Sequence, residues 1–220
     1  MTLFKSIGND LSYTDIIQLD GCFSVAHINY GESPLFNGVD GKQIAVGSRQ
    51  DKISSKEHIE DVIDMLTSFD GTEVGFDAED RIELWKSYWV EYIKAFDKMT
   101  TILPNSIVTL FIGRQAIEVG IKYLLLRKEG EIFTKHDLWV LASKLFDEYD
   151  IKDDYMKHVQ SFCGLYSKYI EGEKPEYFRF PEYKQNKYFA GNSLDIKWLS
   201  YNLALILLKL IHFAGIESEF

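Results

Sequence analysis

Hydrophobic residues recur at helical spacing along most of the chain after residue 77. Apolar side chains three and four positions apart form one broad stripe over residues 78–100, whereas residues 104–128 are apolar on almost every side. The whole pattern predicts four long helices, the third with a continuation, at residues 78–100, 104–128, 136–149 with 152–170, and 193–214. Long helices joined mostly by short links are typical of a helical bundle, and the second helix should be central.

The ends of the predicted helices carry residues that commonly start or stop a helix. Pro104 is expected in the first turn of the central helix, and Gly130 is expected to end it. Thr134 and Asp137 are expected to cap the helix at 136–149. This start would place His136 in the first turn of that helix.

The first 76 residues follow a different pattern. Residues favourable to β-structure predict strands at 22–30 and 42–48, and residues 54–69 open with a capping box and continue at helical spacing. We therefore predict a mainly α protein, with a small mixed α/β extension at 1–76 and an up-and-down helical bundle at 77–220.

Charge is unevenly distributed between these two parts. The formal net charge is −10 at pH 7, and the first 76 residues hold 5 basic and 12 acidic residues, a net charge of −7. An acidic protein repels phosphate at long range, which disfavours non-specific nucleic-acid binding. The extension could cover a basic cleft of the bundle, or it could be a layer packed on the bundle.

The cysteines and the most apolar segment indicate the cellular compartment of the protein. Cys22 and Cys163 are the two cysteines, too few for a disulfide framework or a zinc site. The first residues lack the apolar core of a signal peptide, and the apolar stretch 203–215 is too short for a bilayer and contains Lys209. We expect a cytoplasmic protein without membrane association.

Charged residues interrupt the apolar central helix. Arg114, Glu118 and Lys122 are four positions apart, so they share one face of that helix. One interpretation is a solvated or ion-paired stripe, which is common on helices. The other is a face of a cleft, in which Glu118 pairs with Arg114 until a ligand competes.

His136 is a second candidate for chemistry. Near a helix N-terminus the macrodipole favours the neutral imidazole, which could donate one hydrogen bond and accept another. The alternative is a histidine with a capping or packing role. The sequence contains no common zinc, P-loop, dinucleotide or serine-hydrolase motif, so we expect neither a metal nor a cofactor.

The connection at 171–192 is long for a compact domain, and long connections are often functional. It holds six aromatic residues together with Arg179 and Lys184. The rings could stack a base next to the arginine, or they could fix the connection to the bundle.

Three short motifs together resemble the HEPN domain (higher eukaryotes and prokaryotes nucleotide-binding). Gln115, Glu118 and Lys122 occur on one predicted helix, "HDL" at 136–138 opens the next, and Arg179-Phe180-Pro181 precedes the final apolar helix. The resemblance covers about residues 80–214. It implies a helical bundle that dimerises, and in active family members an Arg and a His, with four to six residues between them, cut RNA without a metal.

The chain departs from the catalytic pattern of that family. Counting from Arg179, the histidine would fall at 184–186, which are Lys, Gln and Asn, and positions 119–121 after Arg114 also lack a histidine. The resemblance therefore favours a non-catalytic homodimer that binds a nucleotide, RNA or a protein, within a stress, toxin–antitoxin or phage-defence system, with a nucleotidyltransferase as a possible partner. The alternative is a metal-independent ribonuclease that uses His136 with Arg179 or Arg114.

The expected ligand-binding residues come from all three motifs and their surroundings. They are Arg114, Glu118, Lys122, His136, Asp137, Arg179 and Lys184.

Overall fold

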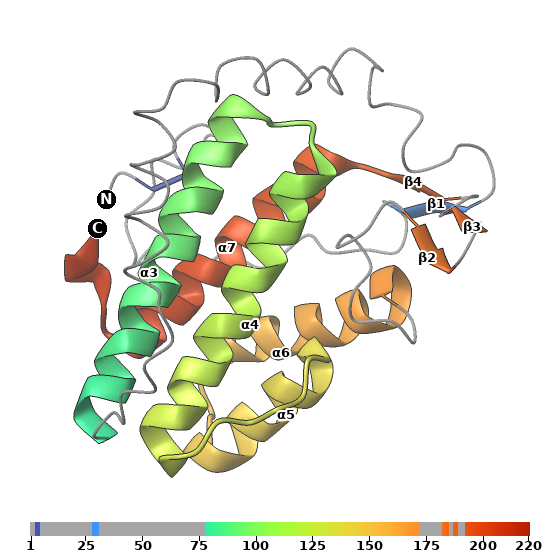
Figure 1. The fold of residues 1–220 in the computed structure, drawn as a ribbon. Helices are drawn as coiled ribbons and strands as arrows, with labels where there is room; N and C mark the ends of the chain where they lie inside the picture. Colours follow the sequence, from blue (N-terminus) through green and yellow to red (C-terminus); the bar gives the residue numbers. More distant parts are fainter. Residues whose placement is uncertain (1–2, 5–27, 31–77, 172–181, 185–186, 189–191) are drawn as a thin grey trace, which may run out of the picture.

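The computed structural model describes residues 3–4, 28–30, 78–171, 182–184, 187–188 and 192–220, and these residues are mainly α-helical (Figure 1). The α-helices of this part are α3 (Ala78–Ile102), α4 (Ile107–Glu129), α5 (Leu138–Tyr149), α6 (Asp154–Tyr166) and α7 (Ile196–Ala214). A π-helical turn, η5 (Ser167–Glu171), continues α6, and a 3₁₀ turn, η6 (Glu217–Glu219), follows α7. The mainly α prediction and the order of its helices are confirmed.

Short strands occur at the edge of this bundle. Strand β1 (Ile28–Tyr30) pairs antiparallel with β4 (Asn192–Leu194), and β2 (Glu182–Lys184) pairs with β3 (Lys187–Tyr188). Strand β1 forms the end of the segment predicted as a strand at 22–30. The strand predicted at 42–48 and the helix predicted at 54–69 lie outside the described residues.

Helix α4 is the centre of the bundle, as its apolar sequence predicts. It packs against α3, α5 and α7, and Figure 1 shows it beside α3, with α7 crossing behind both and α5 and α6 near its lower end. Side chains such as Ile117, Ile121 and Leu124 are completely buried there. Helix α7 is long and apolar enough to cross a membrane, but most of it is buried inside the bundle, as expected for a core helix.

Two helices start later than predicted, although Asp137 is confirmed as a cap. Ser106 caps α4, and its hydroxyl accepts a hydrogen bond from the Val108 backbone N–H at 3.2 Å, so Pro104 lies in the preceding turn. Asp137 caps α5, and its carboxylate accepts from the Val140 N–H at 2.9 Å. His136 therefore lies before the helix and not in its first turn.

The predicted end of α4 is confirmed. Gly130 adopts a left-handed conformation with φ of 79°, and its N–H donates to the Leu126 carbonyl at 2.8 Å. Glycine enters this conformation without the steric cost that other residues incur. The chain therefore leaves α4 sharply and can run back towards the start of α5.

Leu3 and Phe4 belong to the core of the bundle. The Phe4 ring is fully buried and lies 5.4 Å from the Phe96 ring, and its backbone N–H donates to the Asp97 carboxylate at 2.5 Å. Phe4, a residue of the predicted extension, thus packs directly on α3. The boundary between residues 76 and 77 stays a prediction, and α3 begins one residue after it.

Gly120 is where α3 and α4 approach most tightly. A Cβ atom at this position would lie 2.4 Å from the indole of Trp89, a side chain that is completely buried. We expect Gly120→Ala to lower the free energy of unfolding by roughly 2 kcal/mol, because overpacking outweighs the better helix propensity of alanine. Urea denaturation measures this change.

Trp89→Phe supplies the control for that prediction, because a smaller ring gives the new methyl group room. Gly120→Ala should cost less in the Trp89→Phe background than in the wild type. An equal cost in both backgrounds would show that the indole contact is not the cause.

Candidate functional site

Arg114 is buried inside the bundle, and its guanidinium is surrounded by acceptors. Its Nε donates to Glu171 Oε1 at 2.6 Å, and its Nη2 donates to the His136 carbonyl at 2.5 Å and to Glu171 Oε2 at 3.3 Å. Its Nη1 donates to Glu118 and, at 3.3 Å, to Gln115. Every N–H of the guanidinium thus has an acceptor, which an arginine buried in an apolar environment requires.

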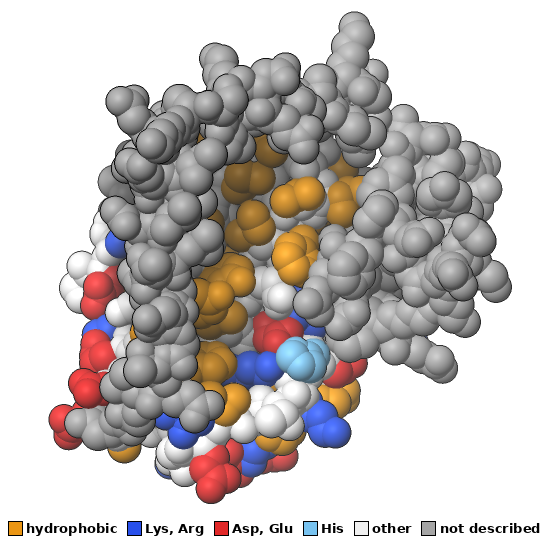
Figure 2. All heavy atoms as spheres, viewed as in Figure 1, with side chains coloured by type: hydrophobic (Ala, Val, Ile, Leu, Met, Phe, Trp, Pro, Cys, Tyr) orange, Lys and Arg blue, Asp and Glu red, His pale blue; other side chains and the backbone are white. Residues whose placement is uncertain are grey.

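Glu118 links this buried arginine to the surface. While one carboxylate oxygen binds Arg114, the other lies 2.8 Å from Lys122 Nζ and 2.8 Å from His136 Nδ1. The side chains of Glu118 and Lys122 are buried, whereas that of His136 is 65% exposed. Figure 2 shows one histidine at the surface beside acidic and basic side chains, below a hollow lined with hydrophobic side chains.

Glu171 reaches the site through the π-helical turn. Helix α6 ends at Tyr166, and η5 widens the next turn so that the buried carboxylate of Glu171 meets Arg114. π-helical turns are rare and frequently occur at functional sites. Glu171 is a functional candidate that the sequence analysis missed, because position 171 is predicted there as the start of the long connection and not as part of a helix.

Burial and charge shift the pKa values of this network in different directions. Burial raises the pKa of Glu171 to about 7, with help from Asp137 and Glu118 and against the attraction of Arg114. Burial acts the same way on Glu118, but Arg114 and Lys122 outweigh it and lower the pKa. The pKa of Arg114 is raised, because the two carboxylates outweigh the effect of its burial.

This arrangement can orient an exposed imidazole. A charged carboxylate can only accept, so Glu118 accepts a hydrogen bond from the Nδ1–H of His136 at 2.8 Å. In the neutral ring this leaves Nε2 as the acceptor. A carboxylate behind a histidine fixes its tautomer and orientation, as in acid–base sites of many enzymes. The same imidazole can also bind an anion when it is protonated.

The structure shows how the charged stripe on α4 is paired. The first interpretation was a solvated or an ion-paired stripe. Arg114, Glu118 and Lys122 are ion-paired, and they are buried and not solvated. The expected pair between Arg114 and Glu118 is confirmed. At the far end of the stripe, Arg114 contacts Glu171, the first residue of the 171–192 connection.

The structure describes the other predicted site residues to different extents. Asp137 is a helix cap and lines a neighbouring groove, so its carboxylate is partly occupied. Lys184 lies in β2, without a described side-chain position, and Arg179 lies outside the described residues. Within the part of the chain that is described, no three His, Cys, Asp or Glu side chains gather as a metal site.

Comparison with known proteins does not add a family. Neither a protein-family model nor a curated protein nor a solved structure matches this chain. The resemblance to the HEPN domain therefore rests on the three motifs alone.

Glu171 should make stability depend on pH. Its pKa is raised from 4.5 to about 7 in the folded state, so the stabilisation linked to its proton is complete below pH 4.5 and lost as pH rises through 7. We expect the free energy of unfolding to fall by roughly 2 to 3 kcal/mol more in the wild type than in Glu171→Gln between pH 5 and 8. Urea denaturation at several pH values measures the difference.

Glu91→Gln is the matched control for this experiment, because Glu91 is exposed on α3. It should keep the wild-type pH profile. Glu118 cannot produce the same signal, since its lowered pKa affects stability at pH values below 4.5. A Glu171→Gln profile parallel to that of the wild type would contradict the assignment.

Proposed function

We propose that this chain is a HEPN-like module that binds an anionic ligand, a nucleotide or RNA, through His136 and Lys122, without the Arg–His ribonuclease pair of the family. The observation that carries the proposal is the exposed imidazole of His136, fixed by a buried network of two cations and two carboxylates. A site built in this way is costly to maintain for stability alone, because replacing buried ion pairs by apolar residues is often neutral or favourable.

The positions of the motifs support the HEPN-like interpretation. Glu118 and Lys122 on α4 meet the "HDL" segment at the start of α5, where His136 contacts Glu118. Two of the three motifs that carry the resemblance therefore form one cluster. The dimer implied by the resemblance belongs to the proposal as well.

The charge of the network supports an anionic ligand. Arg114 and Lys122 contribute two positive charges, and Glu118 contributes one negative charge. Glu171, with a pKa of about 7, is partly protonated near neutral pH, so these four side chains carry a small positive balance, with the Asp137 carboxylate beside them. In a chain of net charge −10, this balance is a local attraction for phosphate.

Replacing His136 tests the proposal directly. We expect His136→Ala to weaken the binding of AMP and of a hexa-adenylate about tenfold, the size expected for one charge-assisted hydrogen bond. Isothermal titration calorimetry measures the affinities. Lys152→Ala is the control, because this exposed lysine follows the opposite end of α5 and should leave binding unchanged.

Equal affinities in the wild type and in His136→Ala would remove His136 from the site. Absence of binding by the wild-type protein to both probes at millimolar concentration would reject the proposed function itself.

The contact between Glu118 and His136 favours a second candidate, a metal-independent ribonuclease. In such a reaction the Nε2 of His136 would take the proton of the ribose 2′-hydroxyl while the 2′-oxygen attacks the phosphorus. The bond from phosphorus to the 5′-oxygen would break, which leaves a 2′,3′-cyclic phosphate, and water or the imidazolium would protonate the leaving 5′-oxygen. Arg114 is a poor partner for this reaction, because all its donors are occupied and its side chain is buried. The arginine would have to be Arg179, which lies outside the described residues.

The ribonuclease candidate predicts cleavage of single-stranded RNA by the wild type in the presence of EDTA and its loss in His136→Ala. Loss of a general base lowers the rate about 100-fold or more. Gel analysis of a labelled RNA measures it, with Lys152→Ala as the active control. Background cleavage by both the wild type and His136→Ala would eliminate this candidate.

A further inference from the structure

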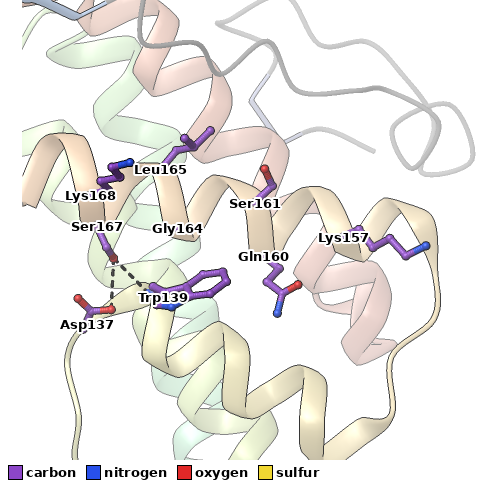
Figure 3. A pocket seen from close by; sticks show the side chains of 9 residues that line it. All are labelled: Asp137, Trp139, Lys157, Gln160, Ser161, Gly164, Leu165, Ser167 and Lys168. Carbon is purple, nitrogen blue, oxygen red and sulfur yellow. Dashed lines mark hydrogen bonds between the residues drawn. The ribbon is translucent and has the colours of Figure 1, made fainter.

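A groove runs between the start of α5 and the outer face of α6, next to the His136 site (Figure 3). Its volume is about 660 Å³, within the range of small-molecule sites. Trp139 and Asp137 line it from the α5 side, and Gln160, Gly164 and Lys168 line it from the α6 side. None of these residues contributes a side chain to the ion-pair network around Arg114.

Trp139 gives the groove a rigid aromatic surface. Its side chain is 46% exposed, although its indole packs against α6 at Gly164, where a Cβ atom would lie 2.9 Å from the ring. Its backbone N–H donates to the Ser167 hydroxyl at 3.1 Å, and that hydroxyl donates to Asp137 at 3.4 Å. Figure 3 shows the indole extending along the groove from this anchor. A tryptophan held in this way offers a flat surface for another ring.

Cationic side chains line the groove beyond the indole. Lys157 and Lys168 belong to the lining, and Asp137 is its single carboxylate, already engaged as the cap of α5. Lys157 pairs with exposed Asp154 at 2.7 Å, a contact that contributes little in water. Lys168 lies over the Tyr169 ring at 4.9 Å, which leaves its ammonium protons available to an anion. The lining therefore favours negative charge next to an aromatic surface.

We propose that this groove binds a planar aromatic ring that carries an anionic group, as in a free nucleotide or an unpaired nucleotide of RNA. The ring stacks on Trp139, and the anion binds Lys168 or Lys157. This inference rests on the proposed function, because it supplies the base-binding part of the same ligand. Stacking on an aromatic side chain tolerates every base, so the groove selects unpaired bases and not a sequence.

The groove and the His136 site share one short segment. His136 and Trp139 are three residues apart, so their Cα atoms are separated by at most about 11 Å. Asp137 lies between them, lines the groove, and contributes to the raised pKa of Glu171 in the network. The two sites are therefore close neighbours along the chain.

Replacement of Trp139 tests the groove, with AMP, ribose 5-phosphate and hexa-adenylate as probes in calorimetry. We expect Trp139→Ala to weaken AMP binding about 5- to 100-fold, the loss of one stacked base, and Trp139→Phe to retain most of it. Ribose 5-phosphate has no base, so its affinity should be low and insensitive to either variant. A tighter hexa-adenylate complex would identify RNA, and equal affinities would identify a free nucleotide.

Val140→Ala is the matched control, because Val140 is an exposed neighbour outside the groove lining. Lys168→Ala provides a second test, and it should weaken AMP and leave adenosine unchanged. Circular dichroism confirms that each variant is folded.

The outcomes separate this inference from the proposed function. If His136→Ala weakens AMP binding and Trp139→Ala does not, the inference about the groove is wrong and the proposed function is unaffected. Loss of binding in Trp139→Ala but not in His136→Ala would support the groove and overturn the His136 site. If Trp139→Ala instead lowers the mass of the protein in solution without changing AMP affinity, the groove is a protein interface and the inference is wrong.

Discussion

The buried guanidinium of Arg114 is the constraint on which this bundle depends. A positive charge inside an apolar core is tolerated only where carboxylates and carbonyls surround it. Here the acceptors come from α4 itself, from the segment before α5 and from the end of η5. Removing one partner would leave an unpaired charge, which costs about 3 to 5 kcal/mol in comparable cases. The network therefore fixes the position of three chain segments relative to one another.

That constraint also fixes the functional surface. The carbonyl of His136 is held by Arg114 while its imidazole is held by Glu118, so both backbone and side chain of this exposed residue are positioned. Three residues later, Trp139 is anchored through Ser167, which opens η5. The two candidate contacts for a ligand are thus supported by the same two segments, the start of α5 and the turn after α6.

The sequence predicts the helices well because their signals are local. Apolar spacing located α3 to α7 within a few residues, and Gly130 marked the end of α4 correctly. The errors at Pro104 and His136 arose where two possible caps compete within two or three residues. Glu171 could not be found in this way, because it pairs with Arg114 across 57 positions and depends on a π-helical turn that no short pattern encodes.

The sequence could pair Arg114 with Glu118, but it does not reveal which carboxylate around the arginine keeps its charge near neutral pH. Glu118 is held by Lys122 and His136 as well, and its lowered pKa keeps it charged. Glu171 has only Arg114 as an ion-pair partner among the described residues, and its pKa of about 7 allows it to lose its charge near neutral pH. Protonation of Glu171 would therefore weaken its pair with Arg114 first, while Glu118 keeps its charge. The imidazole of His136 would stay in place, because the carboxylate that orients it is the one that stays charged.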